Sequence, residues 1–398
     1  MGGVTEQDPA SSSLAELALP NPLHDLHVRA DAEFQSYGGV EIVCTFGEPQ
    51  AEYSALHKGC ALTDLPQRGI LQVGGTDRLD FLNRLLTNQL IDKDTKTPIP
   101  AGAGVYAFLL NEKGRIVTDI NVLERGDFTL LEADARMISA LEAALKKYAF
   151  REKVTFASQI GQLHQIALHG PRSGEILRLC SPELALPEPL GSAAGKIFDA
   201  PVTVWRDDPV ASPGYFLILP TDAAAGVWQT ILAKFATPET AEVQKSKRAV
   251  WPCGWAAFNA ARIEAGRPLF GIDFDGTVLP AETGQFQRAV NVAKGCYVGQ
   301  EIVVRMYARQ QIPRQVVGIK MELDALPVAG ASVFDAEQNR VGQITSSTIS
   351  PILSNAALCL AMVKKPFYAS GAKLHIAAEG AIRIGFVVDL PFVLRKEA

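Results

Sequence analysis

The sequence predicts an α+β protein with a separate carboxy-terminal β domain, and three observations support this prediction. The chain has 398 residues, which exceeds the size at which a single hydrophobic core keeps growing. From about Phe34 onward, segments with helical spacing of apolar residues alternate with short strand-like runs. From about Gln315 the helical spacing ends and strand-like runs dominate. We therefore predict a mobile tail at 1–22, two related α+β units within 23–314, and a β domain at 315–398.

Composition narrows the class of protein. Hydrophobic residues make up 47% of the chain and charged residues 20%, which is typical of a globular protein. No apolar stretch is long enough to span a bilayer, so we expect no membrane partner. The net charge of -5 argues against direct binding of nucleic acid, which requires many cations. The first basic residue is Arg29, so a secretory signal is not expected and we predict a cytoplasmic protein.

The first α+β unit is expected from a helix followed by a pair of strands. Thr76 and Asp77 are candidate caps for that helix, and a turn at 111–114 separates strands at 105–110 and 116–123. Asp119 therefore lies inside a strand. The apolar residues with helical spacing are Leu79, Phe81, Leu82, Leu85, Leu86 and Leu90.

The same pattern continues and then repeats. We predict a helix at 134–148 and strands at 154–157 and 163–169. The repeat contributes strands at 201–206 and 215–219 and a helix from Thr221.

A further helix at 254–265 ends at Gly266, since Pro268 cannot continue it. Arg262 in its last turn complements the helix dipole, whereas Glu264 does not. Glu264 therefore needs a partner, for which Arg267 or a backbone amide is a candidate.

The β domain is predicted from short apolar runs joined by turns. The runs lie at 316–320, 341–349, 357–363, 374–378 and 382–388.

The motif KGCYVGQE at 294–301 is the strongest candidate site in the sequence. Its two glycines permit a tight loop that a ligand can approach closely. Lys294 lies two positions from Cys296, and a nearby cation raises the thiolate fraction of a cysteine. The alternative is that Cys296 is a small apolar core residue. The six cysteines include no CxxC pair or Cys/His set, so we expect no metal site.

With these elements in place, the chain resembles the YgfZ/GcvT superfamily, which includes the glycine-cleavage T-protein and the folate-binding YgfZ proteins. The similarity covers most of 34–392, and the segment at 294–301 resembles the YgfZ signature. The resemblance implies a cloverleaf-like arrangement of three parts around a central hole that receives tetrahydrofolate, ending in a β-barrel. The segments that carry it are GRIVTD at 114–119, ARIEAG at 261–266, GID at 271–273, PAE at 280–282, KGCYVGQE at 294–301, GQITSSTISP at 342–351 and AMV at 361–363.

The chain departs from the T-protein pattern at two places. Where the T-protein has paired aspartates, this chain has Thr118 and Asp119, so one acid remains. Where the T-protein has a Tyr-Thr-Gly-Glu segment, this chain has Pro-Val-Ala-Ser at 209–212. We therefore expect the carboxylate that grips the pterin to be absent, because a serine hydroxyl supplies neither its charge nor its two-point geometry.

Six residues are the predicted functional residues. Cys296 and Asp119 are the catalytic candidates, and the alternative for Asp119 is a strand aspartate satisfied by a neighbour. The resemblance favours Arg262 as a folate ligand, and the other cofactor-binding candidates are Lys294, Tyr297 and Gln300. The alternative for Tyr297 is a core residue, and the alternative for Gln300 is a side chain that bonds the amides of its own loop. Arg288 and Arg305 are interpreted as solvated surface charges.

The first functional hypothesis is a tetrahydrofolate-binding accessory factor that assists assembly or repair of iron–sulfur enzymes, including tRNA-modifying ones. Cys296 is its working thiol and Lys294 the activator, because one thiolate can pass on a ligand but cannot hold a cluster. The second hypothesis is an aminomethyltransferase that uses a lipoyl carrier protein and Asp119. The third is a folate-binding module without catalysis.

Overall fold

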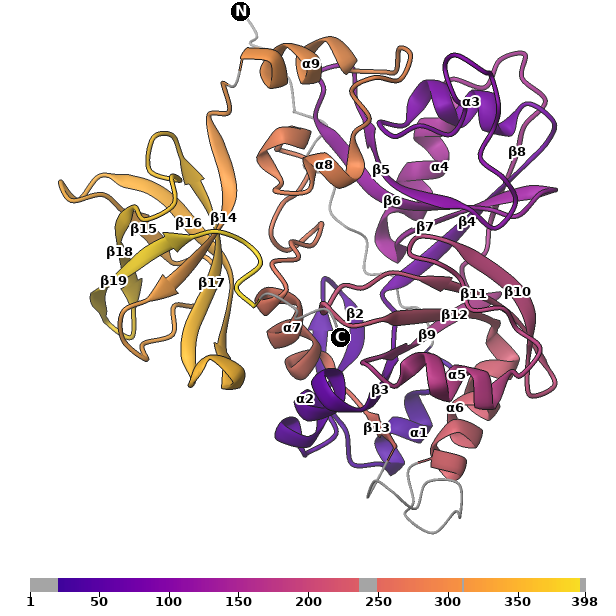
Figure 1. Ribbon diagram of the computed structural model, residues 1–398, viewed down its shortest axis with the longest axis horizontal. Helices are drawn as coiled ribbons and strands as arrows, with labels where there is room; N and C mark the ends of the chain where they lie inside the picture. Colours follow the sequence, from indigo (N-terminus) through magenta and orange to yellow (C-terminus); the bar gives the residue numbers. More distant parts are fainter. Residues whose placement is uncertain (1–20, 236–248, 310, 394–398) are drawn as a thin grey trace, which may run out of the picture.

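The computed structural model describes residues 21–235, 249–309 and 311–393. The predicted tail at 1–22 therefore lies almost entirely outside the described residues. Two sheets with their helices occupy one side of the molecule and a β-barrel occupies the other, with α7, α8 and α9 between them (Figure 1). This arrangement confirms the predicted α+β fold with a carboxy-terminal barrel.

The first sheet is antiparallel and has the strand order β5-β6-β7-β4-β8. Apolar side chains of α3 and α4 are buried against one face, where they form a single core with β4, β5, β6 and β7. The elements are β4 (Arg68–Gly74), α3 (Arg78–Leu85), β5 (Gly104–Leu110), β6 (Ile116–Glu124), β7 (Phe128–Asp134), η2 (Ala135–Met137), α4 (Ile138–Lys146) and β8 (Thr155–Ser158).

One helix of this unit is shorter than its apolar spacing predicts. Helix α3 ends at Leu85, and Leu86 is extended although it is fully buried. Leu90 is also buried, but it is placed by a loop in which its backbone amide donates to Asn83 Oδ1 over 2.9 Å. The predicted cap Asp77 precedes the helix, yet its carboxylate accepts from the backbone of Lys153 instead of capping.

The second sheet has the order β10-β11-β12-β9-β3-β13. Its strand β3 precedes the whole first sheet in sequence, so the two units interleave instead of following one another. The elements are α1 (His24–Arg29), β3 (Cys60–Asp64), β9 (Leu163–His169), α5 (Ser173–Cys180), β10 (Ser192–Ile197), β11 (Ala200–Arg206), β12 (Gly214–Pro220), α6 (Thr221–Phe235) and β13 (Val250–Pro252), which pairs in parallel with β3.

The barrel closes in the order β14-β17-β16-β15-β18-β19. Each predicted strand is present, and the sequence missed only the short β15 and the 3-10 turn η5. The elements are β14 (Arg314–Met321), β15 (Ser332–Phe334), β16 (Arg340–Ser350), η5 (Pro351–Leu353), β17 (Ala356–Lys364), β18 (Lys373–Ala378) and β19 (Ala381–Val388).

Helix α7 joins the barrel to the remainder of the molecule. It packs against α2, β2 and barrel strand β16. Glu264, in its last turn, accepts hydrogen bonds from the Tyr53 hydroxyl over 2.7 Å and from the Ser350 hydroxyl over 2.5 Å, and lies 3.2 Å from His57 Nε2. The partners expected for Glu264, Arg267 or a backbone amide, were therefore wrong. The connecting elements are β1 (Glu33–Tyr37), β2 (Val40–Thr45), α2 (Pro49–Lys58), α7 (Trp255–Glu264), η4 (Pro280–Glu282), α8 (Phe286–Ala289) and α9 (Gln300–Arg309).

None of the helices in the described part of the chain is long and apolar enough to span a membrane.

Candidate active site

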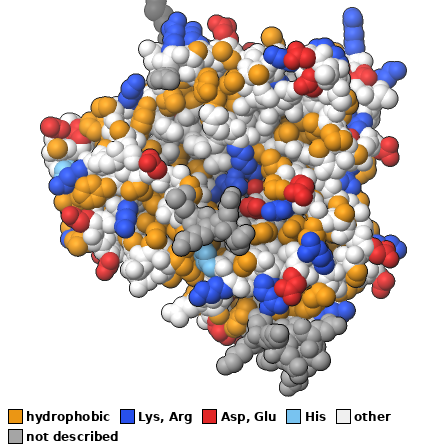
Figure 2. Space-filling view, in the orientation of Figure 1, with side chains coloured by type: hydrophobic (Ala, Val, Ile, Leu, Met, Phe, Trp, Pro, Cys, Tyr) orange, Lys and Arg blue, Asp and Glu red, His pale blue; other side chains and the backbone are white. Residues whose placement is uncertain are grey.

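A small cavity lies where the two sheets meet α7, α8 and the loop between them. Its volume is about 90 Å³. Lys and Arg side chains lie in a hollow near the centre of the face drawn in Figure 2. The residues that line the cavity include Tyr37, Arg68, Tyr106, Asp119, Asn121, Glu132, Trp205, Asp207, Phe216, Trp255, Phe258, Arg267, Phe270 and Arg288.

The first sheet contributes the acidic wall of the cavity. Tyr106, Asn121 and Glu132 are direct neighbours across β5, β6 and β7, and Asp119 lies on the same face two residues before Asn121. Glu132 is fully engaged, since Arg68 donates to both of its oxygens over 2.5 and 2.7 Å and the Asn121 amide donates over 2.8 Å. The acidic wall therefore offers one carboxylate that still has an open oxygen.

That carboxylate is Asp119, which is only 8% exposed. The Tyr106 hydroxyl donates to its Oδ2 over 3.0 Å, and Oδ1 has no hydrogen-bond partner among the described residues. Burial raises the pKa of Asp119, although the charge of Arg68 and the Tyr106 hydroxyl oppose the shift. Asp119 lines the cavity and has an unpaired oxygen that can hold a proton or accept a hydrogen bond.

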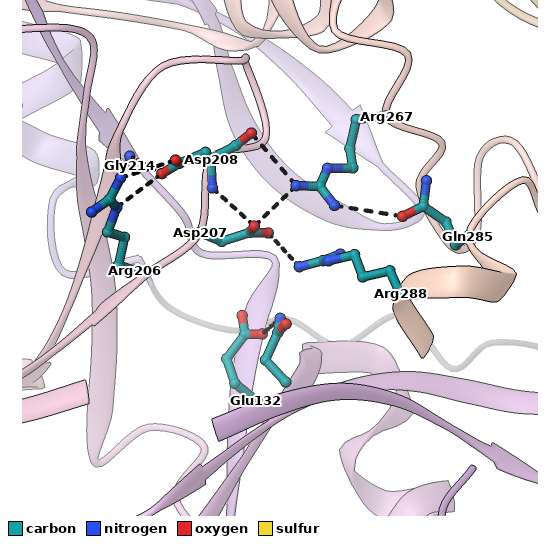
Figure 3. A network of polar contacts seen from close by, with 9 residues as sticks. Glu132, Arg206, Asp207, Asp208, Gly214, Arg267, Gln285 and Arg288 are labelled. Carbon is teal, nitrogen blue, oxygen red and sulfur yellow. Dashed lines mark hydrogen bonds and ion pairs between the residues drawn. The ribbon is translucent and has the colours of Figure 1, made fainter. Parts of the chain in front are cut away.

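The opposite wall carries a shared ion pair. Arg267 donates to one oxygen of Asp207 over 3.0 Å and Arg288 to the other over 2.8 Å. Figure 3 shows both guanidinium groups pointing at this carboxylate, while Arg206 approaches Asp208 from the other side. Burial opposes ionisation of Asp207, yet the two arginines lower its pKa.

Aromatic rings complete the cavity. Trp205 and Phe216 stack with centroids 4.2 Å apart, and the Arg288 guanidinium lies 4.0 Å from the centre of the Tyr106 ring. Flat apolar walls beside carboxylates and guanidinium groups suit a flat heteroaromatic ligand that also carries donors and an anionic group.

Both parts of the chain match known families. Residues 23–294 match the GCVT N-terminal domain, and residues 314–393 match the glycine cleavage T-protein C-terminal barrel domain. The chain belongs to the glycine cleavage T-protein family. Aminomethyltransferases of this family use tetrahydrofolate, the ligand that the sequence resemblance implied.

Curated relatives match this T-protein family member over almost their whole length. The aminomethyltransferase of Geobacillus kaustophilus is 27% identical over 378 residues, which cover 94% of this chain and 99% of the relative. That of Moorella thermoacetica is 28% identical over 378 residues, covering 94% and 98%. The crystal structure of aminomethyltransferase T from Bartonella henselae has the same fold, with a TM-score of 0.79 at 23% identity over 94% of this chain and 97% of that one. The narrower YgfZ assignment stays a prediction.

Arg262, a predicted folate ligand in this T-protein family member, lies outside the cavity. Its side chain is fully buried, and its guanidinium pairs with Asp273 and donates to Ser346 over 2.6 Å and to Asn259 over 2.9 Å. The contact with Ser346 joins α7 to the barrel. The structure therefore gives Arg262 a role in holding the barrel in place.

Lys294 is buried at the end of α3. Its ammonium donates to the backbone carbonyls of Asn83, Leu86 and Asn88 over 2.7, 2.5 and 2.8 Å. All three of its donors are used on carbonyls, so this contact set stabilises the helix end and provides no bond to Cys296. Burial lowers the pKa of Lys294 to about 7, whereas the three carbonyls favour its charged form.

The remaining residues of the motif face different surroundings. Cys296 is the exposed cysteine of the described chain, where the others are buried or half-buried. Tyr297 is 6% exposed, its hydroxyl has no partner among the described residues, and burial raises its pKa to about 12. Gln300 begins α9, and its backbone amide bonds to the Tyr297 carbonyl over 3.2 Å. Of the six predicted functional residues, Asp119 is the one that lines the central cavity.

The loop itself is fixed by a close approach of two backbones. Gly299 has φ of +78°, and a Cβ placed there would lie 2.7 Å from the Asn111 carbonyl oxygen and 2.9 Å from Gly114 Cα. Only glycine fits this position without a shift of the neighbouring turn. The described residues include no group of three His, Cys, Asp or Glu side chains suited to a metal ion.

Sequence reasoning missed the basic wall. Arg288 was interpreted as a solvated surface charge, but it lines the cavity between Asp207 and Tyr106. The segment at 209–212 has no carboxylate, but Asp207, two residues before Pro209, lines the cavity. The adjacent acids Asp207 and Asp208, directly after an apolar strand, were the available signal.

Proposed function

We propose that this chain is a tetrahydrofolate-dependent aminomethyltransferase, with the central cavity as its active site. The observation that carries the proposal is the open oxygen of Asp119 in a buried, aromatic-lined cavity. The relatives support it, because they match over 94% of the chain and are named aminomethyltransferases.

The residues of the cavity fit the ligand and its chemistry. Tetrahydrofolate supplies the nitrogen atoms that accept a one-carbon unit. Trp205 and Phe216 offer an apolar surface for a pterin ring, and Asp119 Oδ1 offers an acceptor for an N–H donor of that ring. A raised pKa brings Asp119 nearer the pH at which the protein works, which favours a general acid or base.

Asp119→Asn tests this proposal directly. The purified protein is given tetrahydrofolate and a lipoyl carrier protein loaded with an aminomethyl group, and formation of methylenetetrahydrofolate is measured. We expect the variant to lose about 10²–10⁴-fold in rate, which is the usual contribution of a positioned acid or base. Asp127→Asn, an exposed position beyond the end of the same strand, is the matched control and should transfer at the wild-type rate.

Stability separates a catalytic loss from unfolding. Burial raises the pKa of Asp119 above its unfolded value of 3.8, so ionised Asp119 disfavours the folded state at neutral pH. Asp119→Asn removes that charge and should keep or increase the free energy of unfolding at pH 7. Absence of transfer by the wild-type protein would exclude the aminomethyltransferase.

The exposed thiol of Cys296 favours a second candidate function, a folate-binding accessory factor for iron–sulfur enzymes. A single accessible thiolate can pass on a sulfur or metal ligand, or attack an electrophile. Deletion of the gene followed by complementation with Cys296→Ala would then lower the activity of a cluster-dependent tRNA-modifying enzyme while glycine cleavage stays normal. In the uncomplemented deletion strain, loss of glycine cleavage with an unaffected tRNA-modifying enzyme supports the transferase instead.

A further inference from the structure

In the ion pair on the basic wall of the cavity, two arginines share one carboxylate. Arg267, Arg288 and Asp207 are each 15–21% exposed, and all three line the cavity. The cluster therefore has one more positive than negative charge in a mostly buried place. Such an excess attracts a second anion.

The bonding of these arginines is also incomplete. Each arginine contacts only one oxygen of Asp207. Two bidentate pairs lie nearby, Arg68 with Glu132 and Arg206 with Asp208. A guanidinium has five donors, and its preferred partner is a carboxylate that binds through both oxygens.

Little else uses the donors of Arg267 and Arg288. Arg288 makes one side-chain hydrogen bond within the described chain, and it goes to Asp207. The other bonds of Arg267, to Gln285 and to the Asp208 carbonyl, are both 3.5 Å long. Donors of both arginines therefore remain for a ligand.

Residues of its own loop hold the Asp207 carboxylate between the two guanidinium groups. Its Oδ1 also accepts from the Asp208 backbone amide over 2.9 Å, and Asp208 is in turn fixed by Arg206 and by the Gly214 amide. With Asp207 in place the cavity measures about 90 Å³, well below the roughly 300 Å³ at which small-molecule sites begin. A folate-sized ligand therefore requires a group of the cavity wall to move.

We propose that Arg267 and Arg288 form a carboxylate-binding subsite which the chain's own Asp207 fills until a ligand arrives. The ligand class is a flat aromatic ring that carries a carboxylate, so the inference rests on the proposed function and assigns the glutamate end of a folate to the basic wall. The pterin end then faces Asp119, on the far side of Tyr106. Asp207 competes with the ligand carboxylate and is not one of its contacts.

Asp207→Asn tests this assignment because the two possible roles of Asp207 predict opposite signs. Asparagine keeps the oxygen that accepts from Asp208 but removes the competing charge. Binding of tetrahydrofolate and of 6-methyltetrahydropterin, which has the ring without the p-aminobenzoylglutamate tail, is measured by calorimetry with the full-length protein under anaerobic conditions. We expect the Kd for tetrahydrofolate to fall about tenfold while that for the pterin stays unchanged, because one charged hydrogen-bonding competitor is removed.

Two further variants complete the test. Arg288→Gln should raise the Kd for tetrahydrofolate about tenfold and leave the Kd for 6-methyltetrahydropterin within about twofold. Asp208→Asn is the matched loop control, since Asp208 pairs with Arg206 and does not line the cavity. It should leave both dissociation constants unchanged, and unfolding curves confirm that each variant is folded.

The results separate this subsite from the proposed function. If Asp207→Asn weakens binding of both ligands, Asp207 grips the ligand itself and the inference is overturned while folate binding stands. An unchanged tetrahydrofolate affinity in this variant overturns it as well. Binding by Asp207→Asn alone, with none by the wild type, supports the subsite, and failure of both proteins to bind either ligand overturns both proposals.

Discussion

The central cavity and the loop at 294–301 are built in opposite ways. The loop is eight consecutive residues, yet Lys294 is buried under α3, Cys296 is exposed and Tyr297 is buried. The cavity draws on residues as distant in sequence as Asp119 and Arg288, and these face one small volume. Adjacent residues in a loop therefore need not share a site, whereas neighbours across a sheet do.

This difference has an energetic counterpart. The cavity contains charges that are buried together, so changes there alter stability and ligand binding at once. The loop contributes one structural cation and one solvent-facing thiol, which can be changed separately. Four substitutions, in order of decreasing expected effect, compare buried groups around the cavity with the loop.

Arg262→Met should have the largest effect on stability. It removes the cation paired with fully buried Asp273, and leaving a buried charge without its partner costs about 3–5 kcal/mol. Urea unfolding followed by circular dichroism measures the loss. Arg206→Met, which breaks a partly exposed pair with Asp208, is the control and should cost less than about 1 kcal/mol. A stable Arg262→Met protein with weakened folate binding would return Arg262 to the ligand site predicted from sequence.

His169→Leu should change how stability depends on pH. His169 is fully buried against Phe216 and Phe258, neither of its ring nitrogens has a partner in the described chain, and burial lowers its pKa from 6.5 to about 4. Because the unfolded chain binds this proton more tightly, folded stability falls as the pH drops from 6.5 towards 4. The loss reaches about 3 kcal/mol.

In the leucine variant this part of the acid loss should be absent. Urea midpoints measured at pH 7 and pH 4.5 compare the two proteins. An equal loss in both would show that His169 does not titrate behind the aromatic wall of the cavity.

Lys294→Met should destabilise the fold by about 1–3 kcal/mol, because three backbone carbonyls lose their donor. The reaction rate of the Cys296 thiol with a disulfide reagent should change less than about twofold, since the ammonium is committed to α3. Lys113→Met, an exposed lysine on the neighbouring turn, is the control for loss of one charge. A tenfold slower thiol in Lys294→Met would restore Lys294 as the activator of Cys296.

Cys296→Ser should have the smallest effect on stability, within about 0.5 kcal/mol, because an exposed side chain away from structural contacts contributes little. Cys60→Ser, at a fully buried thiol, is the contrast and should cost about 1–3 kcal/mol because it buries a hydroxyl. Thermal unfolding of the two variants gives the comparison. Equal losses would mean that Cys296 packs in the fold after all.

The sequence was most informative where local spacing decides the structure. The strands of the barrel were predicted closely. A strand is indicated by alternating apolar residues and by the turn residues at its ends, and both signals lie within a few positions of it. Helix α3 was predicted too long, because Leu86 and Leu90 are buried by an irregular loop instead of a helix. Local spacing indicates that a residue is buried, but not which element buries it.

The candidate site divides in the same way. Asp119 was singled out from its strand and from a family motif, and it does line the cavity. Arg262 was singled out on the same grounds and lies outside it, while Arg288 was set aside and lies inside. A charged side chain in a sequence gives no indication of whether its partner is solvent, the fold or a ligand.

By itself, the sequence determined the fold class, the barrel strands, the family resemblance and one of the acids of the cavity, because these depend on periodicity and on short motifs. The tertiary structure decided which charges meet. Only the packing of two interleaved sheets against α7 and α8 brings Arg267 and Arg288 to Asp207 and turns Lys294 towards α3 instead of Cys296. Those pairings are set by distances between segments as much as two hundred residues apart, and Coulomb and hydrogen-bond energies depend on such distances and not on sequence separation.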